Sequence, residues 1–129
     1  MDDRHVYIKR SVILSILEYA SARHPKEGIL LLRGKVERKK IMVEEVEVPP
    51  LSISGYGFSS FQPYMLPIDF SIIGTAHSHP SGVLRPSSTD INKFYGRIMM
   101  IAAYPYRTER DIAVFDGRGD PLEYEIIEE

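Results

Sequence analysis

The chain has 129 residues, a formal net charge of −2 and no cysteine. Hydrophobic residues make up 43% of it and charged residues 26%, which is typical of a soluble globular protein. This length predicts one domain, residues 1–129, that can bury a core without disulfide bonds. The absence of cysteine excludes a disulfide framework and a thiol nucleophile, and it fits a reducing compartment.

The distribution of charge argues against nucleic-acid and membrane partners. The most basic stretch, Lys35 to Lys40, is short, and we expect it to be a solvated hairpin turn. No signal peptide is recognised, and no apolar run approaches the ~20 residues that a membrane span needs. We therefore predict a cytoplasmic protein that binds neither nucleic acid nor membrane.

The first part of the chain is predicted to form a helix and a β-hairpin. Apolar residues at helical spacing predict a helix from about Lys9 to Arg23, which ends before Pro25. The apolar run Gly28 to Leu32, closed by Gly34, predicts a buried strand. Alternating apolar residues from Lys40 to Val48 predict a second strand that pairs with the first. This order favours an α+β layer structure.

A long segment rich in proline, glycine and serine follows, from Pro49 to Pro67. Only Gly57 to Gln62 within it is predicted as a short strand. Loops of this length inside compact domains are often functional. We therefore consider Phe58, Tyr64 and Met65 candidates for contact with a partner.

The remainder is predicted to contain four strands and one short helix. The strands are Phe70 to Ala76, Arg97 to Ala103, Asp111 to Phe115 and Leu122 to Ile127. The helix runs from Ser87 to Tyr95, and a turn at Asp116 to Gly119 joins the last two strands. The methionines at 99 and 100 and the tyrosines at 104 and 106 are expected to pack in the core and at its rim.

Two histidines follow the first of these strands, in the run His77-Ser78-His79-Pro80. On an extended backbone, residues two apart lie on the same face. Asp90 follows after a loop that is long enough to fold back and supply a third ligand. Two imidazoles, one carboxylate and an open position are typical of catalytic zinc sites, whereas structural zinc sites are closed by four ligands, often thiolates.

Each of these residues also has a structural explanation. Ser87-x-x-Asp90 is a good helix capping box, and a single His-x-His pair could be two polar residues at a strand end. The combination in this spacing is what favours a metal site. His5, near the N-terminus, and His24, at a helix end where a cationic ring is favourable, are not assigned to it.

Taken together, these residues resemble the signature of the JAMM (MPN-type) metalloproteases. That signature is His-x-His-Pro, six further residues and then Ser-x-x-Asp, with a glutamate upstream that corresponds to Glu27. The resemblance implies an α+β domain with cytidine-deaminase-like topology. Its mixed, curved β-sheet would be flanked by a long N-terminal helix and by a short helix after the histidine motif. The short chain, without long insertions, is most similar to prokaryotic and especially archaeal members.

The resemblance also implies roles for individual residues. His77, His79 and Asp90 would bind one zinc ion per chain, Glu27 would be the general base for a zinc-bound water, and Ser87 would stabilise the oxyanion. Zinc can lower the pKa of its water to about 7, and amide cleavage also needs a base to carry a proton to the leaving amine. The implied reaction cuts the bond between the C-terminal glycine of a ubiquitin-like modifier and a lysine.

Two alternatives remain open at this stage. The same chemistry could trim the C-terminus of a ubiquitin-like sulfur-carrier protein, or the fold could be a non-catalytic interaction scaffold. The scaffold ranks lower because every residue of the signature is present. The expected partner is a protein with a Gly-Gly tail, bound by β-strand addition at Ser54 to Gln62 or at the loop after Pro80.

Overall fold

The computed structural model describes residues 4–49, 53–55, 58–60 and 69–128. The helices are α1 (Arg10–Arg23) and α2 (Ser88–Asn92), with a 3₁₀ turn at Glu109–Asp111. The strands are β1 (His5–Lys9), β2 (Ile29–Val36), β3 (Lys40–Glu47), β4 (Ile53–Gly55), β5 (Phe58–Ser60), β6 (Ile72–His79), β7 (Ile98–Ala103), β8 (Ile112–Phe115), β9 (Pro121–Leu122) and β10 (Tyr124–Ile127). Within the part of the chain described, no helix is long and apolar enough to cross a membrane.

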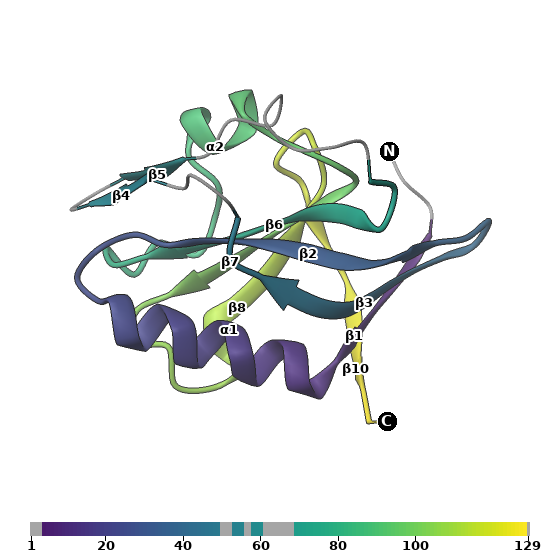
Figure 1. The fold of residues 1–129 in the computed structure, drawn as a ribbon, viewed down its shortest axis with the longest axis horizontal. Helices are drawn as coiled ribbons and strands as arrows, with labels where there is room; N and C mark the ends of the chain where they lie inside the picture. Colours follow the sequence, from purple (N-terminus) through teal and green to yellow (C-terminus); the bar gives the residue numbers. More distant parts are fainter. Residues whose placement is uncertain (1–3, 50–52, 56–57, 61–68, 129) are drawn as a thin grey trace.

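Eight of the strands form one mixed sheet, in the order β10-β1-β3-β2-β6-β7-β8-β9. Strand β6 lies near the middle, antiparallel to β2 and parallel to β7. Backbone hydrogen bonds to both neighbouring strands therefore fix the position of β6. His77 lies opposite Ile29 on β2 and Ile101 on β7. The predicted α+β class with a mixed sheet, a long N-terminal helix and a short helix after the histidines is confirmed (Figure 1).

The main core lies between α1 and one face of the sheet. The apolar stripe predicted on the helix is fully buried, and it consists of Val12, Ile13, Ile16, Leu17 and Ala20. Burial of each valine, isoleucine and leucine in this stripe contributes roughly 1.5–3 kcal/mol. On the opposite face, Leu84 and Phe94, on either side of α2, pack against the buried side chains of Met99, Ile101 and Phe115. The α2 segment is thereby anchored over the face of the sheet that does not carry α1.

The N-terminal strand β1 (His5–Lys9) was not predicted. His5 opens β1 and pairs with Lys40 of β3, while β1 also pairs with β10. Both pairings are parallel and join segments far apart in sequence, so local periodicity does not reveal them. Five residues of alternating burial directly before a helix give only a weak strand signal.

The boundaries of β2 and β6 also differ from the prediction. Strand β2 does not close at Gly34 but continues to Val36, because the missing side chain lets β3 approach: a Cβ at Gly34 would lie 1.7 Å from the Met42 carbonyl oxygen. Strand β6 begins at Ile72 rather than Phe70, whose side chain is 92% exposed, and it includes both histidines.

The predicted strand Leu122 to Ile127 is in fact two strands at opposite edges of the sheet. Strand β9 pairs with β8, whereas β10 pairs with β1. Only Glu123 separates them in sequence, so the sheet has to curve until its two edges meet. The predicted curvature follows from this connection.

The other differences concern lengths. Helix α2 has five residues and is shorter than Ser87 to Tyr95. The predicted strand at Gly57 to Gln62 is represented by β5, which pairs with β4 in a separate two-stranded sheet. Tyr64, Met65 and most of the predicted loop lie outside the described residues.

Candidate metal centre

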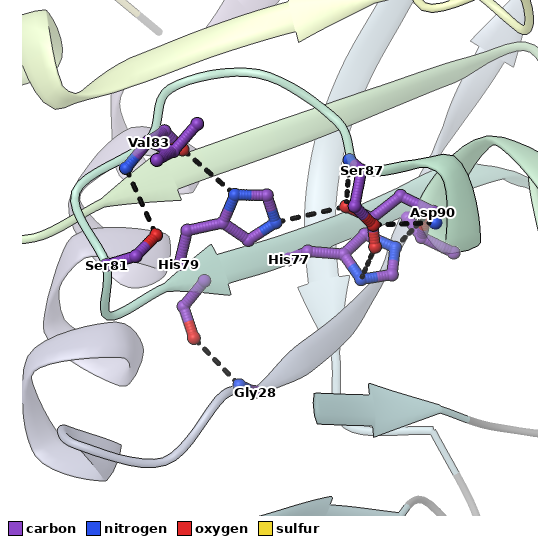
Figure 2. Close-up of polar contacts among 9 residues, drawn as sticks. Gly28, His77, His79, Ser81, Val83, Ser87 and Asp90 are labelled. Atoms are coloured by element: carbon purple, nitrogen blue, oxygen red, sulfur yellow. Dashed lines mark hydrogen bonds and ion pairs between the residues drawn. The ribbon is translucent and has the colours of Figure 1, made fainter. Parts of the chain in front are cut away.

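Strand β6 presents its two histidines on the face of the sheet that carries α2 (Figure 2). Because alternate residues of a strand face opposite sides, Ser78 between them faces the α1 side. The side chains of His77 and His79 are only 10% and 9% exposed. The histidine pair is therefore a nearly buried group on a rigid central strand.

Helix α2 places Asp90 opposite the histidines through its N-terminal cap. The Ser87 hydroxyl accepts a hydrogen bond from the Asp90 backbone amide at 3.0 Å, and the Ser87 amide donates to Asp90 Oδ2 at 2.9 Å. The capping box expected from the sequence is thus present. The capping box does not exclude a contact with the histidines, because the Asp90 carboxylate that accepts the Ser87 amide also faces them.

One carboxylate contacts both imidazoles. Asp90 Oδ2 lies 3.1 Å from Nε2 of His79, and Asp90 Oδ1 lies 3.8 Å from Nδ1 of His77. On its other side, His79 Nδ1–H donates to the Val83 carbonyl at 2.9 Å, and His77 Nε2 lies 3.1 Å from the Thr75 hydroxyl. Such outer contacts fix ring orientation and tautomer, as they do around metal-binding histidines.

The surroundings set the charges of the three side chains. Burial lowers the pKa of His77 to about 4, which keeps this imidazole neutral. Burial alone would raise the pKa of Asp90, but hydrogen bonds from His79 and from the Ser87 amide lower it to about 2. Burial also opposes charge on His79, yet its bonds with Asp90 and Val83 and the nearby Glu27 raise its pKa. The cluster therefore stabilises a positive charge between His79 and Asp90.

Glu27 lies between α1 and β2, and its backbone is tied to the histidine strand. The next residue, Gly28, donates its amide to the Ser78 hydroxyl at 2.7 Å and accepts a bond from the Ser78 amide at 3.1 Å. Burial raises the pKa of Glu27, His79 lowers it and Asp90 raises it. The Glu27 carboxyl thus lies within electrostatic reach of His79 and Asp90.

The donor set fits a divalent metal ion, although its atoms contact one another in this conformation. Among the residues that the structure describes, no group of three or more His, Asp or Glu side chains stands ready to hold an ion. Metal ligands must be deprotonated, and a neutral imidazole at His77 with an ionised Asp90 meets that need. An ion held by His77, His79 and Asp90 would replace the imidazole–carboxylate contacts.

Sequence reasoning did not find the residues that support this cluster. Thr75, Ser78 and the Val83 carbonyl contact the histidines or the Glu27 segment, and both Thr75 and Ser78 are buried. Thr75 lies two residues before His77, so strand alternation could have placed it on the same face. Residue identity does not indicate which backbone carbonyl will contact a histidine, so the contact of Val83 with His79 could not be predicted.

Comparison with known proteins identifies the family. The pattern of the prokaryotic homologs of the JAB domain matches residues 9–114. A probable metalloprotease of Haloferax volcanii is 34% identical over 119 residues, which cover 87% of this chain and 73% of that protein.

Solved structures show the same relationship. A JAB1/MPN domain protein from Archaeoglobus fulgidus is 31% identical with a TM-score of 0.70, covering 94% of this chain and 98% of that one. A structure described as a JAMM metalloprotease-like zinc site in the proteasome and signalosome is 28% identical with a TM-score of 0.67, covering 95% and 98%. A protein from Desulfitobacterium hafniense, 18% identical with a TM-score of 0.61 over 96% and 92%, shares the fold.

The chain therefore belongs to the prokaryotic JAB family, and its enzyme class is that of the JAMM metalloproteases. Membership of a family with a metalloprotease-like zinc site implies a metal ion. The fold expected from the resemblance, an α+β domain of the MPN type, is confirmed.

Asp90→Asn and His77→Ala should each weaken zinc binding by more than about 100-fold, since loss of an outer partner alone costs 10- to 100-fold. Asn at position 90 can still accept the Ser87 amide, so the helix cap survives. Isothermal titration with zinc measures the effect, with Asp120→Ala, an exposed carboxylate, as the control. Undiminished binding by both variants would exclude these ligands.

Thr75→Val should weaken zinc binding by about 10- to 100-fold while leaving the fold intact, because valine keeps the volume but loses the hydroxyl beside His77. Competition with a zinc chelator measures the change. Thr89→Val, at an exposed position of α2, is the matched control and should bind zinc as the wild type does. Equal affinities for both variants would show that Thr75 does not orient His77.

Proposed function

We propose that this protein is a zinc-dependent isopeptidase that releases a ubiquitin-like modifier from a lysine of a target protein in the cytoplasm. His77, His79 and Asp90 would hold one zinc ion per chain. The observation that carries the proposal is the nearly buried contact of two imidazoles with an ionised carboxylate, with the Glu27 carboxyl in electrostatic reach. Membership of the JAMM metalloprotease family supports this chemistry.

Zinc, when bound, would polarise the amide carbonyl and lower the pKa of water at the site. Glu27 takes a proton from the water whose oxygen attacks the carbonyl carbon. It then gives that proton to the lysine nitrogen as the carbon–nitrogen bond breaks, which yields a glycine carboxylate and a free amine. The raised pKa of Glu27 suits this exchange, since a general base works best when its pKa approaches the operating pH.

Ser87 has a hydroxyl proton to offer the oxyanion that forms on the attacked carbonyl. Its oxygen already accepts the Asp90 amide, which leaves the O–H bond free to donate elsewhere. Residue 87 is exposed, so a substrate can reach it. A donor aimed at a developing oxyanion typically contributes a factor of about 10²–10³ to kcat.

The substrate is proposed to be the Gly-Gly tail of a ubiquitin-like protein, in extended form. The β4–β5 hairpin is a small sheet separate from the main one, and its edge offers one place for strand addition. The loop after Pro80, which supplies the Val83 carbonyl to His79, is the other.

The test is mass spectrometry of Gly-Gly-modified lysines in a lysate of the organism that encodes the chain. Purified wild-type protein is compared with the Glu27→Ala variant. Loss of particular conjugates with the wild type alone supports an isopeptidase and names its targets. Unchanged conjugates, with an amino acid released from the tail of a sulfur-carrier protein, would replace the proposal with C-terminal trimming.

Glu27→Gln should keep the zinc affinity of the wild type but lower kcat by about 100-fold or more, because the amide cannot carry a proton. The probe is a Gly-Gly peptide joined through its terminal carboxyl carbon to the side-chain amine of a lysine peptide, below called the isopeptide probe. Glu18→Gln, on α1, is the control. A kcat near that of the wild type would remove Glu27 from the role of base.

Ser87→Ala should lower kcat for the isopeptide probe by about 100-fold with little change in KM, as expected for a contact made in the transition state. Because alanine also removes the helix cap, Ser87→Thr is compared, which keeps both the cap and the hydroxyl. Threonine should restore most of the activity. A change in KM alone would argue against stabilisation of the oxyanion.

A further inference from the structure

The turn between β8 and β9, residues 116–120, is built around one buried aspartate. Asp116 is 5% exposed, and its Oδ1 accepts the amides of Arg118 and Asp120 at 2.9 and 3.0 Å. The Asp116 amide donates to the Asp120 carbonyl at 2.9 Å, and the Gly119 amide donates to the Asp116 carbonyl at 3.0 Å. Hydrogen bonds that all involve Asp116 therefore set the shape of this turn.

The other carboxylate oxygen of Asp116 is in an unfavourable position. Oδ2 is buried and makes no hydrogen bond among the residues that the structure describes. A buried acceptor without a partner destabilises a fold, so its presence calls for an explanation. The contacts of the turn that Asp116 builds supply one.

The turn packs against α2 and the residues that follow it (Figure 1). A Cβ built at Gly119 would lie only 2.8 Å from Cδ1 of Ile91, and a Cβ at Gly117 would lie 3.3 Å from the ring of Phe94. Ile91 is the residue after Asp90, and Phe94 packs on the buried side chains beneath this face of the sheet. The turn therefore contacts the segment that carries Asp90 at two points.

The contact with Ile91 requires the conformation that Asp116 imposes. Gly119 has φ of 85°, in the left-handed region that favours glycine. The residues on either side of it, Arg118 and Asp120, both donate their amides to the Asp116 carboxylate. That carboxylate thus holds the chain on both sides of Gly119, and the missing side chain lets Ile91 approach.

Helix α2 depends on such outside support. It has five residues, and none of them is fully buried. A helix this short does not hold its shape alone. Since Ile91 directly follows Asp90, a shift of Ile91 would also move the Asp90 carboxylate, which lies 3.1 Å from His79. Metal sites tolerate displacements of only about 0.5 Å, so the support beneath Ile91 bears on the ligand geometry.

We propose that Asp116 is a positioning residue for Asp90. Its carboxylate fixes the turn at residues 116–120, the turn supports Ile91 and Phe94, and these two residues hold α2 with Asp90 over the histidines. The effect on zinc binding rests on the proposed function, in which Asp90 is a zinc ligand. The support of α2 by the turn does not depend on that function.

The test compares Asp116→Ala with Asp116→Asn, which keeps an oxygen that can accept both amides. Asp120→Ala is the matched control, because it removes an exposed carboxylate from the same turn but leaves the backbone amide in place. Amide hydrogen exchange at Asp90 and Ile91 is followed by NMR on the metal-free proteins. Zinc affinity is measured by competition with a chelator, well below the melting temperature of each variant.

Asp116→Ala should speed exchange at Asp90 and Ile91 by about tenfold, because the turn loses two hydrogen bonds. It should weaken zinc binding by about 10- to 100-fold, the range expected when a group that orients a metal ligand is lost. Asp116→Asn should restore most of both properties, and Asp120→Ala should match the wild type.

A second pair of variants tests the contact between the turn and α2 directly. Gly119→Ala places a methyl group against Cδ1 of Ile91, and Ile91→Val removes that atom. Gly119→Ala should weaken zinc binding by about tenfold or more. Part of this loss should disappear in the Ile91→Val background, which a double-mutant cycle detects as coupling. Full additivity would show that the turn does not act on α2 through this contact.

Wild-type exchange at Asp90 and Ile91 in a folded Asp116→Ala protein would overturn the proposal. A lower melting temperature with unchanged zinc affinity would overturn it too, since Asp116 would then serve only the fold. If Asp90→Asn binds zinc like the wild type, the ligand assignment of the proposed function fails. The exchange rates of the metal-free proteins would still decide whether Asp116 holds α2.

Discussion

A single carboxylate oxygen joins the two elements that form the candidate metal centre. Oδ2 of Asp90 accepts the Ser87 amide at the start of α2 and meets Nε2 of His79 at the end of β6. Helix and strand are thereby fixed to each other at the site itself. Helix α2 has only five residues, too few to hold a shape alone. Its cap, its flanking apolar residues and this contact with the histidine together determine where the carboxylate lies.

The charges of the cluster are set by two opposing effects. Burial disfavours the charged form of each side chain, and hydrogen bonds and neighbouring charges offset this only in part. Burial disfavours charge on every member, yet Asp90 stays ionised because amide and imidazole groups surround it. The pKa of His77 is lowered, so its imidazole is neutral, whereas the pKa of His79 is raised and its imidazole binds a proton more readily. The nearly buried Asp90 carboxylate, with the imidazoles of His77 and His79 beside it, therefore favours a bound cation. The pKa of Glu27 belongs to the same balance, since burial raises it, His79 lowers it and Asp90 raises it.

Much of this arrangement could be predicted from the sequence. The helix stripe, the β2–β3 hairpin and the spacing of His77, His79 and Asp90 are local patterns, and local patterns are what periodicity and capping rules detect. Their chemistry, together with Glu27, led to the same family as the comparisons.

The remainder depends on contacts that no local pattern encodes. Strand β1 exists because β3 and β10 pair with it, and the break at Glu123 exists because a curved sheet has to close. Around the site, Thr75 is important because the fold places its hydroxyl beside the ring of His77. The sequence alone indicates a threonine in a strand, and that description is correct but incomplete.

The most direct test of the central claim is anomalous diffraction at the zinc absorption edge from crystals of zinc-loaded protein. The account predicts one anomalous peak per chain, within bonding distance of His77, His79 and Asp90, with an open side toward Glu27. A peak elsewhere, or zinc bound without one of these three side chains, would contradict the assignment of this cluster as the metal centre.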